Sequence, residues 1–389
     1  TRVSDRSHKL SRSPGIARES ASRLSLARDS AKRGVSDISP PMATAVGPAG
    51  TRCGNGMLSA SPPTLEGMSH LSLMLAAQAS AAVPGLTLVS TTDISDEHRH
   101  AALATDVDSR AWVVELPQTD DEELGTRERI GALGAIGDGL RSRLPFGVPR
   151  IHGETNVRGR TLTVGEWLPG FRPDPKKIAP EAVASVAQAM ATLHAIPASA
   201  LYEQGRPIHS ANESQRIAVG VVDRAAGTTL LPQSLLRRWE AAYEDTELWQ
   251  FEPCIIHGRL RLDSFLVESD RVTAVTGWRS LQVGDPARDV AWVTAPTMKD
   301  FLSPIETAYR QARPTADQRL FQRGRFWAEL DIARWLLHGL DTGNQVITDQ
   351  ATAAINELHD RVGGDMESTL TEPITRSPHP LAEPPASED

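Results

Sequence analysis

The sequence predicts an α+β fold with two lobes, a small sheet-containing N-lobe and a larger, mainly helical C-lobe. Short β-branched and apolar runs at 87–92, 111–116, 150–152 and 161–167 are typical of strands. Apolar residues at helical spacing over 124–144 indicate a helix that crosses this sheet, and helical periodicity dominates from residue 180 onward. The 389 residues are enough to build two such units around a real core.

In chain order, a helix is expected at 71–82, where the apolar run stops at Pro84-Gly85. Leu168-Pro169-Gly170 breaks the strand pattern, so we predict an N-lobe over 68–168 and a C-lobe over 169–362. The C-lobe helices are expected at 181–194, 235–248, 301–310, 317–340 and 349–361.

Both ends of the chain have a different composition. Residues 1–67 are basic and rich in Ser, Arg, Gly and Pro, and residues 363–389 are rich in Pro, Ser and Glu. Neither stretch has the apolar content to offset the entropy of ordering, so both are predicted to be disordered. Because the chain begins with Thr, a mis-assigned start is one interpretation of 1–67, and a basic tail that binds an acidic partner is the other.

Charge and composition exclude several classes of function. A net charge of -8 argues against a general nucleic-acid binder. No apolar run is long enough to span a membrane, and the two cysteines, Cys53 and Cys254, fit a reducing compartment. We therefore expect a cytoplasmic protein with no nucleic-acid and no membrane partner.

The segment 254–292 carries the clearest motif. It contains His257-Gly258, then an apolar strand and Gly277-Trp278, then Gly284-Asp285-Pro286 and finally Asp289. This order and spacing resemble the catalytic core of the aminoglycoside/choline-kinase-type phosphotransferase family, whose fold is that of protein kinases. Two flanking segments extend the likeness. Glu166, Trp167 and Leu168 resemble the hinge that passes the nucleotide's adenine, and 193–197 resembles the end of the long C-lobe helix.

The resemblance also shows what this chain has replaced. The family's catalytic Asp falls on Arg259, its metal-binding Asn on Ser264 and its metal-binding Asp on Gly277. An arginine has no acceptor capacity for a substrate proton, and glycine offers no ligand to Mg²⁺, which prefers oxygen donors. No metal site is predicted, and the resemblance implies ATP and Mg²⁺ only if the protein is active.

The N-lobe shows related replacements. Glu115 falls where the family places a phosphate-pairing Lys or Arg, and Glu128 falls at that residue's usual partner. Two carboxylates cannot pair as Lys and Glu do, and they would repel phosphate. The stretch 91–105, where a Gly-rich phosphate loop is expected, contains no glycine.

Structural roles are predicted for the residues that are retained. His257 and Gly258 would shape the loop, Asp285 would brace it, and Asp289 would be an N-terminal acid of the next helix. Asp263 and Asp285 are the candidate substitute acids, although a turn position is the stronger interpretation of Asp263. The remaining open alternative is an anion pocket that needs no metal, formed by Arg259, Arg261, Arg271 and Arg279.

Three hypotheses follow. The first is a catalytically degenerate pseudokinase that binds an unknown small molecule or protein in the cleft between the lobes. The second is an active ATP-dependent phosphotransferase for a small-molecule hydroxyl, aminoglycoside- or macrolide-kinase-like, with Asp263 or Asp285 as relocated acid. The third is different chemistry, such as nucleotidyl transfer, on the same scaffold.

Overall fold

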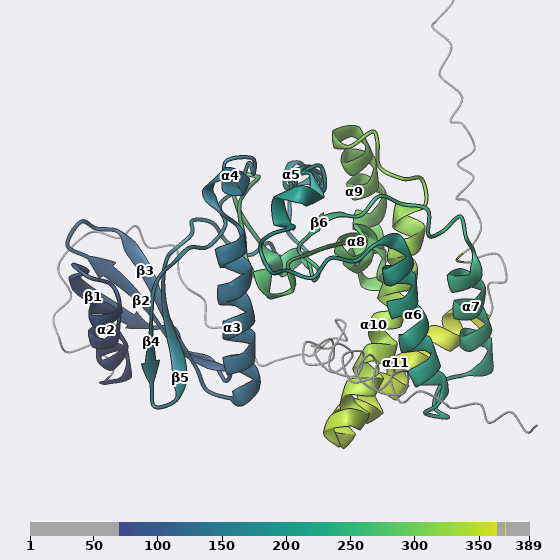
Figure 1. Cartoon of the computed structure of the whole chain (residues 1–389), viewed down its shortest axis with the longest axis horizontal. Helices are drawn as coiled ribbons and strands as arrows, with labels where there is room; N and C mark the ends of the chain where they lie inside the picture. Colours follow the sequence, from purple (N-terminus) through teal and green to yellow (C-terminus); the bar gives the residue numbers. More distant parts are fainter. Residues whose placement is uncertain (1–69, 364–369, 371–389) are drawn as a thin grey trace, which may run out of the picture.

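The computed structural model describes residues 70–363 and residue 370. The predictions for 1–67 and for nearly all of 363–389 lie outside these residues. In the described part, no helix is long and apolar enough to cross a membrane. The chain forms a small sheet-containing lobe and a larger helical lobe, as the sequence predicts, with α3 standing between them (Figure 1).

The N-lobe is built on one antiparallel sheet of five strands in the order β1-β2-β3-β5-β4. The strands are β1 (Leu88–Asp93), β2 (Arg99–Asp106), β3 (Ala111–Pro117), β4 (Ile151–Val157) and β5 (Arg160–Glu166). Helix α2 (His70–Ala82) covers one face, where Leu75 and Ala79 pack on Val114 and Val164. These apolar contacts form the core of the small lobe.

Two N-lobe predictions are corrected by the structure. The expected phosphate loop at 91–105 is mostly strand, because β1 and β2 leave only residues 94–98 between them. The expected helix at 124–144 is two helices, α3 (Asp120–Ala135) and α4 (Asp138–Arg141). Helix α3 starts earlier than predicted, since the Thr119 hydroxyl caps it by accepting from the Glu122 amide.

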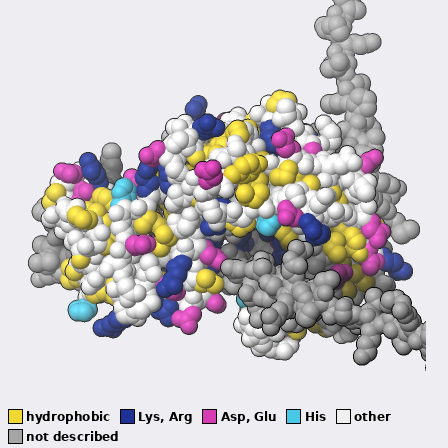
Figure 2. Space-filling view, viewed as in Figure 1, with side chains coloured by type: hydrophobic (Ala, Val, Ile, Leu, Met, Phe, Trp, Pro, Cys, Tyr) yellow, Lys and Arg dark blue, Asp and Glu magenta, His cyan; other side chains and the backbone are white. Residues whose placement is uncertain are grey.

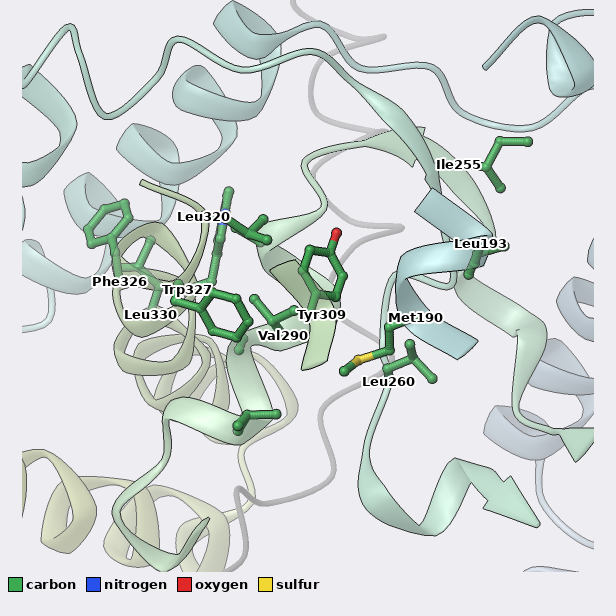
Figure 3. Packing of buried hydrophobic residues seen from close by; sticks show 14 of the residues in the cluster. Met190, Leu193, Ile255, Leu260, Val290, Tyr309, Leu320, Phe326, Trp327 and Leu330 are labelled. Atoms are coloured by element: carbon green, nitrogen blue, oxygen red, sulfur yellow. The ribbon is translucent and has the colours of Figure 1, made fainter. Parts of the chain in front are cut away.

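The C-lobe contains α5 (Pro180–His194), α6 (Ala211–Ala226), α7 (Gln233–Glu244), α8 (Ala287–Val290), α9 (Lys299–Ala312), α10 (Leu320–Thr342) and α11 (Gln345–Gly363). Its buried side chains form one large cluster, part of which is drawn in Figure 3. There, Met190 and Leu193 of α5 lie on one side and Trp327 and Leu330 of α10 on the other, with Tyr309 of α9 between them. Helix α6 was not among the predicted helices, although Ser210 and Glu213 form a capping box at its start.

Two short strand pairs lie within the helical lobe. Strand β6 (Cys254–Ile256) pairs antiparallel with β9 (Gln282–Gly284), and β7 (Phe265–Glu268) pairs with β8 (Arg271–Val275). Because β6 and β9 are paired, the loop that follows β6 and the segment that precedes β9 are brought side by side. Of the residues that the motif singles out, His257, Gly258 and Gly277 lie in these two segments, whereas Asp285 and Asp289 follow β9.

Candidate functional site

A buried carboxylate, that of Asp289, holds the loop after β6 in place. Asp289 accepts hydrogen bonds from the backbone amides of His257 (2.7 Å) and Gly258 (2.8 Å) and from Nε2 of His194 (3.2 Å). Burial alone would raise the pKa of Asp289, but the His194 and His257 interactions bring it below its usual value. Although Asp289 lies in the first turn of α8, its carboxylate is directed to this loop and holds it in place.

His257 is part of the same support. Burial lowers the pKa of its imidazole, so the ring is neutral near pH 7 and its Nε2 donates to the carbonyl oxygen of Thr276 (3.0 Å). The ring also packs against Trp278 at a centroid distance of 4.8 Å. His257 therefore ties the loop to the segment that carries Gly277.

Gly258 is required by the backbone here. Its φ is +84°, and a Cβ atom at this position would overlap the carbonyl oxygen of Ser280. We expect Gly258→Ala to lower the free energy of unfolding by about 2 kcal/mol or more, since the strain adds to the overlap. Urea unfolding monitored by circular dichroism measures the change. Gly220→Ala is the matched control because nothing lies within 4 Å of its added Cβ; an equal loss in both variants would contradict the prediction.

Asp285 is fully engaged by the protein. Its two oxygens accept from Nε and Nη2 of Arg323 (2.8 and 2.9 Å), from the Trp327 indole (2.7 Å) and from the Ala287 amide (2.9 Å). Both partners of the Asp285–Arg323 ion pair are 0% exposed. No lone pair of Asp285 is left over for a metal ion or a substrate, so a bracing role remains our interpretation.

The residues at the family's metal positions do not fit Mg²⁺. The Ser264 hydroxyl accepts from the Arg261 amide at 3.2 Å, and Gly277, with φ +88°, has no side chain. Across residues 70–363, no three His, Cys, Asp or Glu side chains gather as a metal-binding group. The donor set that Mg²⁺ prefers, oxygens that include one or two carboxylates, is not offered at this loop.

Arg259, Arg261 and Asp263 line one large cavity, of about 1760 Å³, together with Arg279. The Asp263 carboxylate lies 3.4 Å from Nε of Arg261. Arg271 does not join this group, because it is exposed on the β7–β8 hairpin and is not among the lining residues. The predicted arginine cluster is thus corrected to three of its four members.

The two N-lobe glutamates each pair with an arginine. Glu115 on β3 pairs with Arg129 of α3 (2.7 Å) and with Arg99 of β2 (3.1 Å), whereas Glu128 pairs with Arg279 (3.6 Å). Burial alone would raise the pKa of Glu115, but Arg129 and Arg99 lower it below its usual value. An ion pair of reversed polarity therefore joins β3 to α3, and its cation is Arg129, one residue after the position that the resemblance assigns to the partner.

The β1–β2 turn uses its amides internally. The Asp93 carboxylate accepts from the Ser95 amide, and the Asp96 carboxylate accepts from the amides of His98 and Arg99, each at 2.9 Å. A phosphate-binding loop needs such amides to point at the ligand. In this turn the carboxylates already occupy the place that a phosphate would take.

The hinge-like segment joins the two lobes. The Trp167 amide donates to the Ala111 carbonyl, and Phe171 pairs with Val267 of β7. Glu166 and Leu168 are partly exposed, and Trp167 is 46% exposed. Nucleotide contact by Glu166, Trp167 and Leu168 remains a prediction from the resemblance.

Sequence reasoning missed several residues of this region. Arg129 could have been noticed because it directly follows Glu128 on the same predicted helix. The cavity residues Arg206 and Arg288 carry no local signal, because they line one cavity only when α8 and the segment before α6 pack together.

Comparisons with known proteins agree with this architecture. Residues 90–337 match the model of the phosphotransferase enzyme family, APH. The fold is similar to a macrolide 2'-phosphotransferase type I (23% identity, 73% of this chain and 96% of that chain, TM-score 0.59). It is also similar to the macrolide 2'-phosphotransferase of Brachybacterium faecium (24%, 73% and 97%, 0.58) and to a GDP complex of aminoglycoside 2'-phosphotransferase-IIIa (16%, 75% and 99%, 0.61). No curated protein sequence matches the chain.

Proposed function

We propose that this chain, which belongs to the phosphotransferase enzyme family, is a pseudokinase. It binds a small molecule between its lobes and transfers no phosphoryl group by the family's metal-dependent route. One observation carries this proposal: no carboxylate stands at the three family positions, which Arg259, Ser264 and Gly277 occupy. Loss of a general base alone costs about a hundred- to ten-thousand-fold in rate.

The N-lobe supports the same proposal. A Lys or Arg that contacts phosphates is replaced by Glu115, which is held by Arg129 and Arg99. The turn at 94–98 directs its amides to Asp93 and Asp96. Both changes remove positive potential from the place where ATP phosphates would need it, because phosphoryl transfer depends mainly on positioning and charge neutralisation.

A second candidate is an active phosphotransferase with Asp263 as a relocated acid. Membership of an enzyme family favours it, and so does the Asp263 carboxylate, which lines the cavity and is only partly buried. Asp285 is the weaker substitute, because all its hydrogen bonds are made within the protein. We also propose a cytoplasmic location, which the buried free thiol of Cys254 supports.

The test is a transfer assay with ATP or GTP, with and without Mg²⁺, and kanamycin or a macrolide as acceptor. We expect no phosphorylated acceptor by mass spectrometry and no Mg²⁺-dependent shift of Tm with either nucleotide. A bound nucleotide at a hundred times its Kd would add about 2.7 kcal/mol of stability, which a thermal scan resolves.

The Asp263→Asn variant separates the two candidates. Transfer by the wild-type protein that disappears in Asp263→Asn would replace the first candidate with the second. Transfer that persists in this variant would contradict both the pseudokinase and the Asp263 mechanism.

A further inference from the structure

One large cavity, which lies mostly in the C-lobe and reaches α3 of the N-lobe at Glu128, is richer in cations than the chain that forms it. Twelve Lys and Arg residues line it against seven Asp and Glu residues, whereas the whole chain has 41 of the former and 49 of the latter. Lys, Arg, Asp and Glu side chains are mixed over the face shown in Figure 2. The positive excess is therefore a local property of the cavity.

Part of this excess has no carboxylate partner. Within residues 70–363 and 370, five lining cations have no carboxylate oxygen within 4.0 Å, namely Arg206, Arg216, Arg288, Lys299 and Arg325. Arg206 donates to the backbone carbonyls of Leu281 (3.0 Å) and Arg279 (3.2 Å), neither of which carries a net charge. Charges with no described counter-charge around a concave surface focus the potential into the cavity and attract anions.

Arg288 differs from the other four cations because a second guanidinium lies close to it. Its guanidinium lies over the Trp327 ring at 5.2 Å, and the guanidinium of Arg334 lies over the same ring at 5.1 Å. Asp331 is paired with Arg334 at 2.8 Å. Burial and the neighbouring Arg334 lower the pKa of Arg288 to about 10. Arg288 and Arg334 thus stack on one indole, and among the described residues only Arg334 of the two has a carboxylate within 4.0 Å, so a bound anion would relieve their repulsion.

The geometry points to a small organic anion, with a phosphate or carboxylate group, as the ligand of this cavity. The anion would bind at Arg288 beside Trp327, and this inference rests on the binding role proposed above. The planar guanidinium fork matches both oxyanions with two parallel hydrogen bonds. The same charges disfavour aminoglycosides, which carry several ammonium groups. The ligand therefore differs in the sign of its charge from the kanamycin named for one similar structure.

Calorimetric titration of the full chain tests this, with pyrophosphate and citrate as separate probes, without Mg²⁺ and at low ionic strength. Pyrophosphate and citrate distinguish a phosphate-selective from a carboxylate-selective site. We expect at least one to bind, kanamycin to bind more weakly than that anion, and Arg288→Gln to weaken anion binding about tenfold or more. Arg271→Gln, which removes an exposed cation outside the cavity, should leave the affinity unchanged.

Absence of binding by both anions would overturn the inference, and so would equal affinities of the wild type and Arg288→Gln, or tighter binding of kanamycin. If Arg288→Gln does not fold, Arg288→Lys takes its place. It keeps the charge and loses the planar fork, and it should weaken binding several-fold. An inactive protein that binds no anion refutes this inference alone, whereas measured phosphoryl transfer refutes the pseudokinase alone.

Discussion

Replacement of Asp285 by alanine is expected to lower the free energy of unfolding by about 3–5 kcal/mol, as when one partner of a buried ion pair is removed. Arg323 and Asp285 are both fully buried, and the carboxylate satisfies the Trp327 indole and the Ala287 amide as well. Burial alone would lower the pKa of Arg323, but Asp285 and Asp317 raise it above its usual value. Without Asp285, the guanidinium keeps hydrogen bonds to Asp317 and the Leu248 carbonyl and its stacking on the Phe251 ring.

Equilibrium urea unfolding of wild type and variant measures this effect. The matched control is Asp341→Ala, which removes the carboxylate of an exposed pair with Arg224 (2.7 Å) and should cost about 1 kcal/mol or less. If Asp285→Ala were as stable as Asp341→Ala, a structural role for Asp285 would be untenable and its candidacy as a relocated acid would be stronger.

Local patterns were sufficient for much of the fold. Helix α5 and strand β3 were predicted within one residue at each end, since α5 has strong helical periodicity and β3 is a compact β-branched run. Strand β2 was missed because its central residues are alanines, which have low strand propensity and give no alternation. Its place in the sheet comes from pairing with β1 and β3, which is a tertiary effect.

In the candidate site, too, some features could be predicted from the sequence and others depend on tertiary packing. The positions of Arg259, Ser264 and Gly277 could be assigned from the resemblance, because they are counted along the sequence from His257-Gly258 and Trp278. The hydrogen-bonding partners of the site residues could not be predicted from the sequence. Arg323 lies 38 residues beyond Asp285, and no sequence pattern links a carboxylate to an arginine at that distance. The charge balance of the cavity is likewise a property of packed helices, so it emerges only in three dimensions.

Glu115→Lys would restore the cation that the family places on β3, yet we expect it to destabilise the N-lobe by about 2–4 kcal/mol instead. The new ammonium would face Arg129 and Arg99, whose guanidiniums lie 2.7 and 3.1 Å from the present carboxylate. The side chain of Glu115 is only 16% exposed, so water screens this repulsion poorly. Simple restoration of the family residue therefore fails because its surroundings have changed sign.

The double variant Glu115→Lys/Arg129→Glu is the decisive comparison. It returns the ion pair to the family's polarity, and we expect it to recover most of the stability lost by Glu115→Lys, which gives a coupling energy of about 1–3 kcal/mol in a double-mutant cycle. Additive losses in the cycle would mean that Glu115 and Arg129 act independently, and the reversed ion pair would then have no energetic basis.

The pH dependence of Glu115→Gln provides an independent measurement. Since the folded-state pKa of Glu115 lies below its ordinary value, its stabilising contribution is complete above the unfolded-state pKa of about 4.3 and is lost as pH falls through the lower folded-state pKa. The stability difference between wild type and Glu115→Gln should therefore be largest near pH 7 and shrink towards pH 3. A difference that grew on acidification would require the neutral carboxyl to be the stabilising form, and the reversed ion pair could not then be what joins β3 to α3.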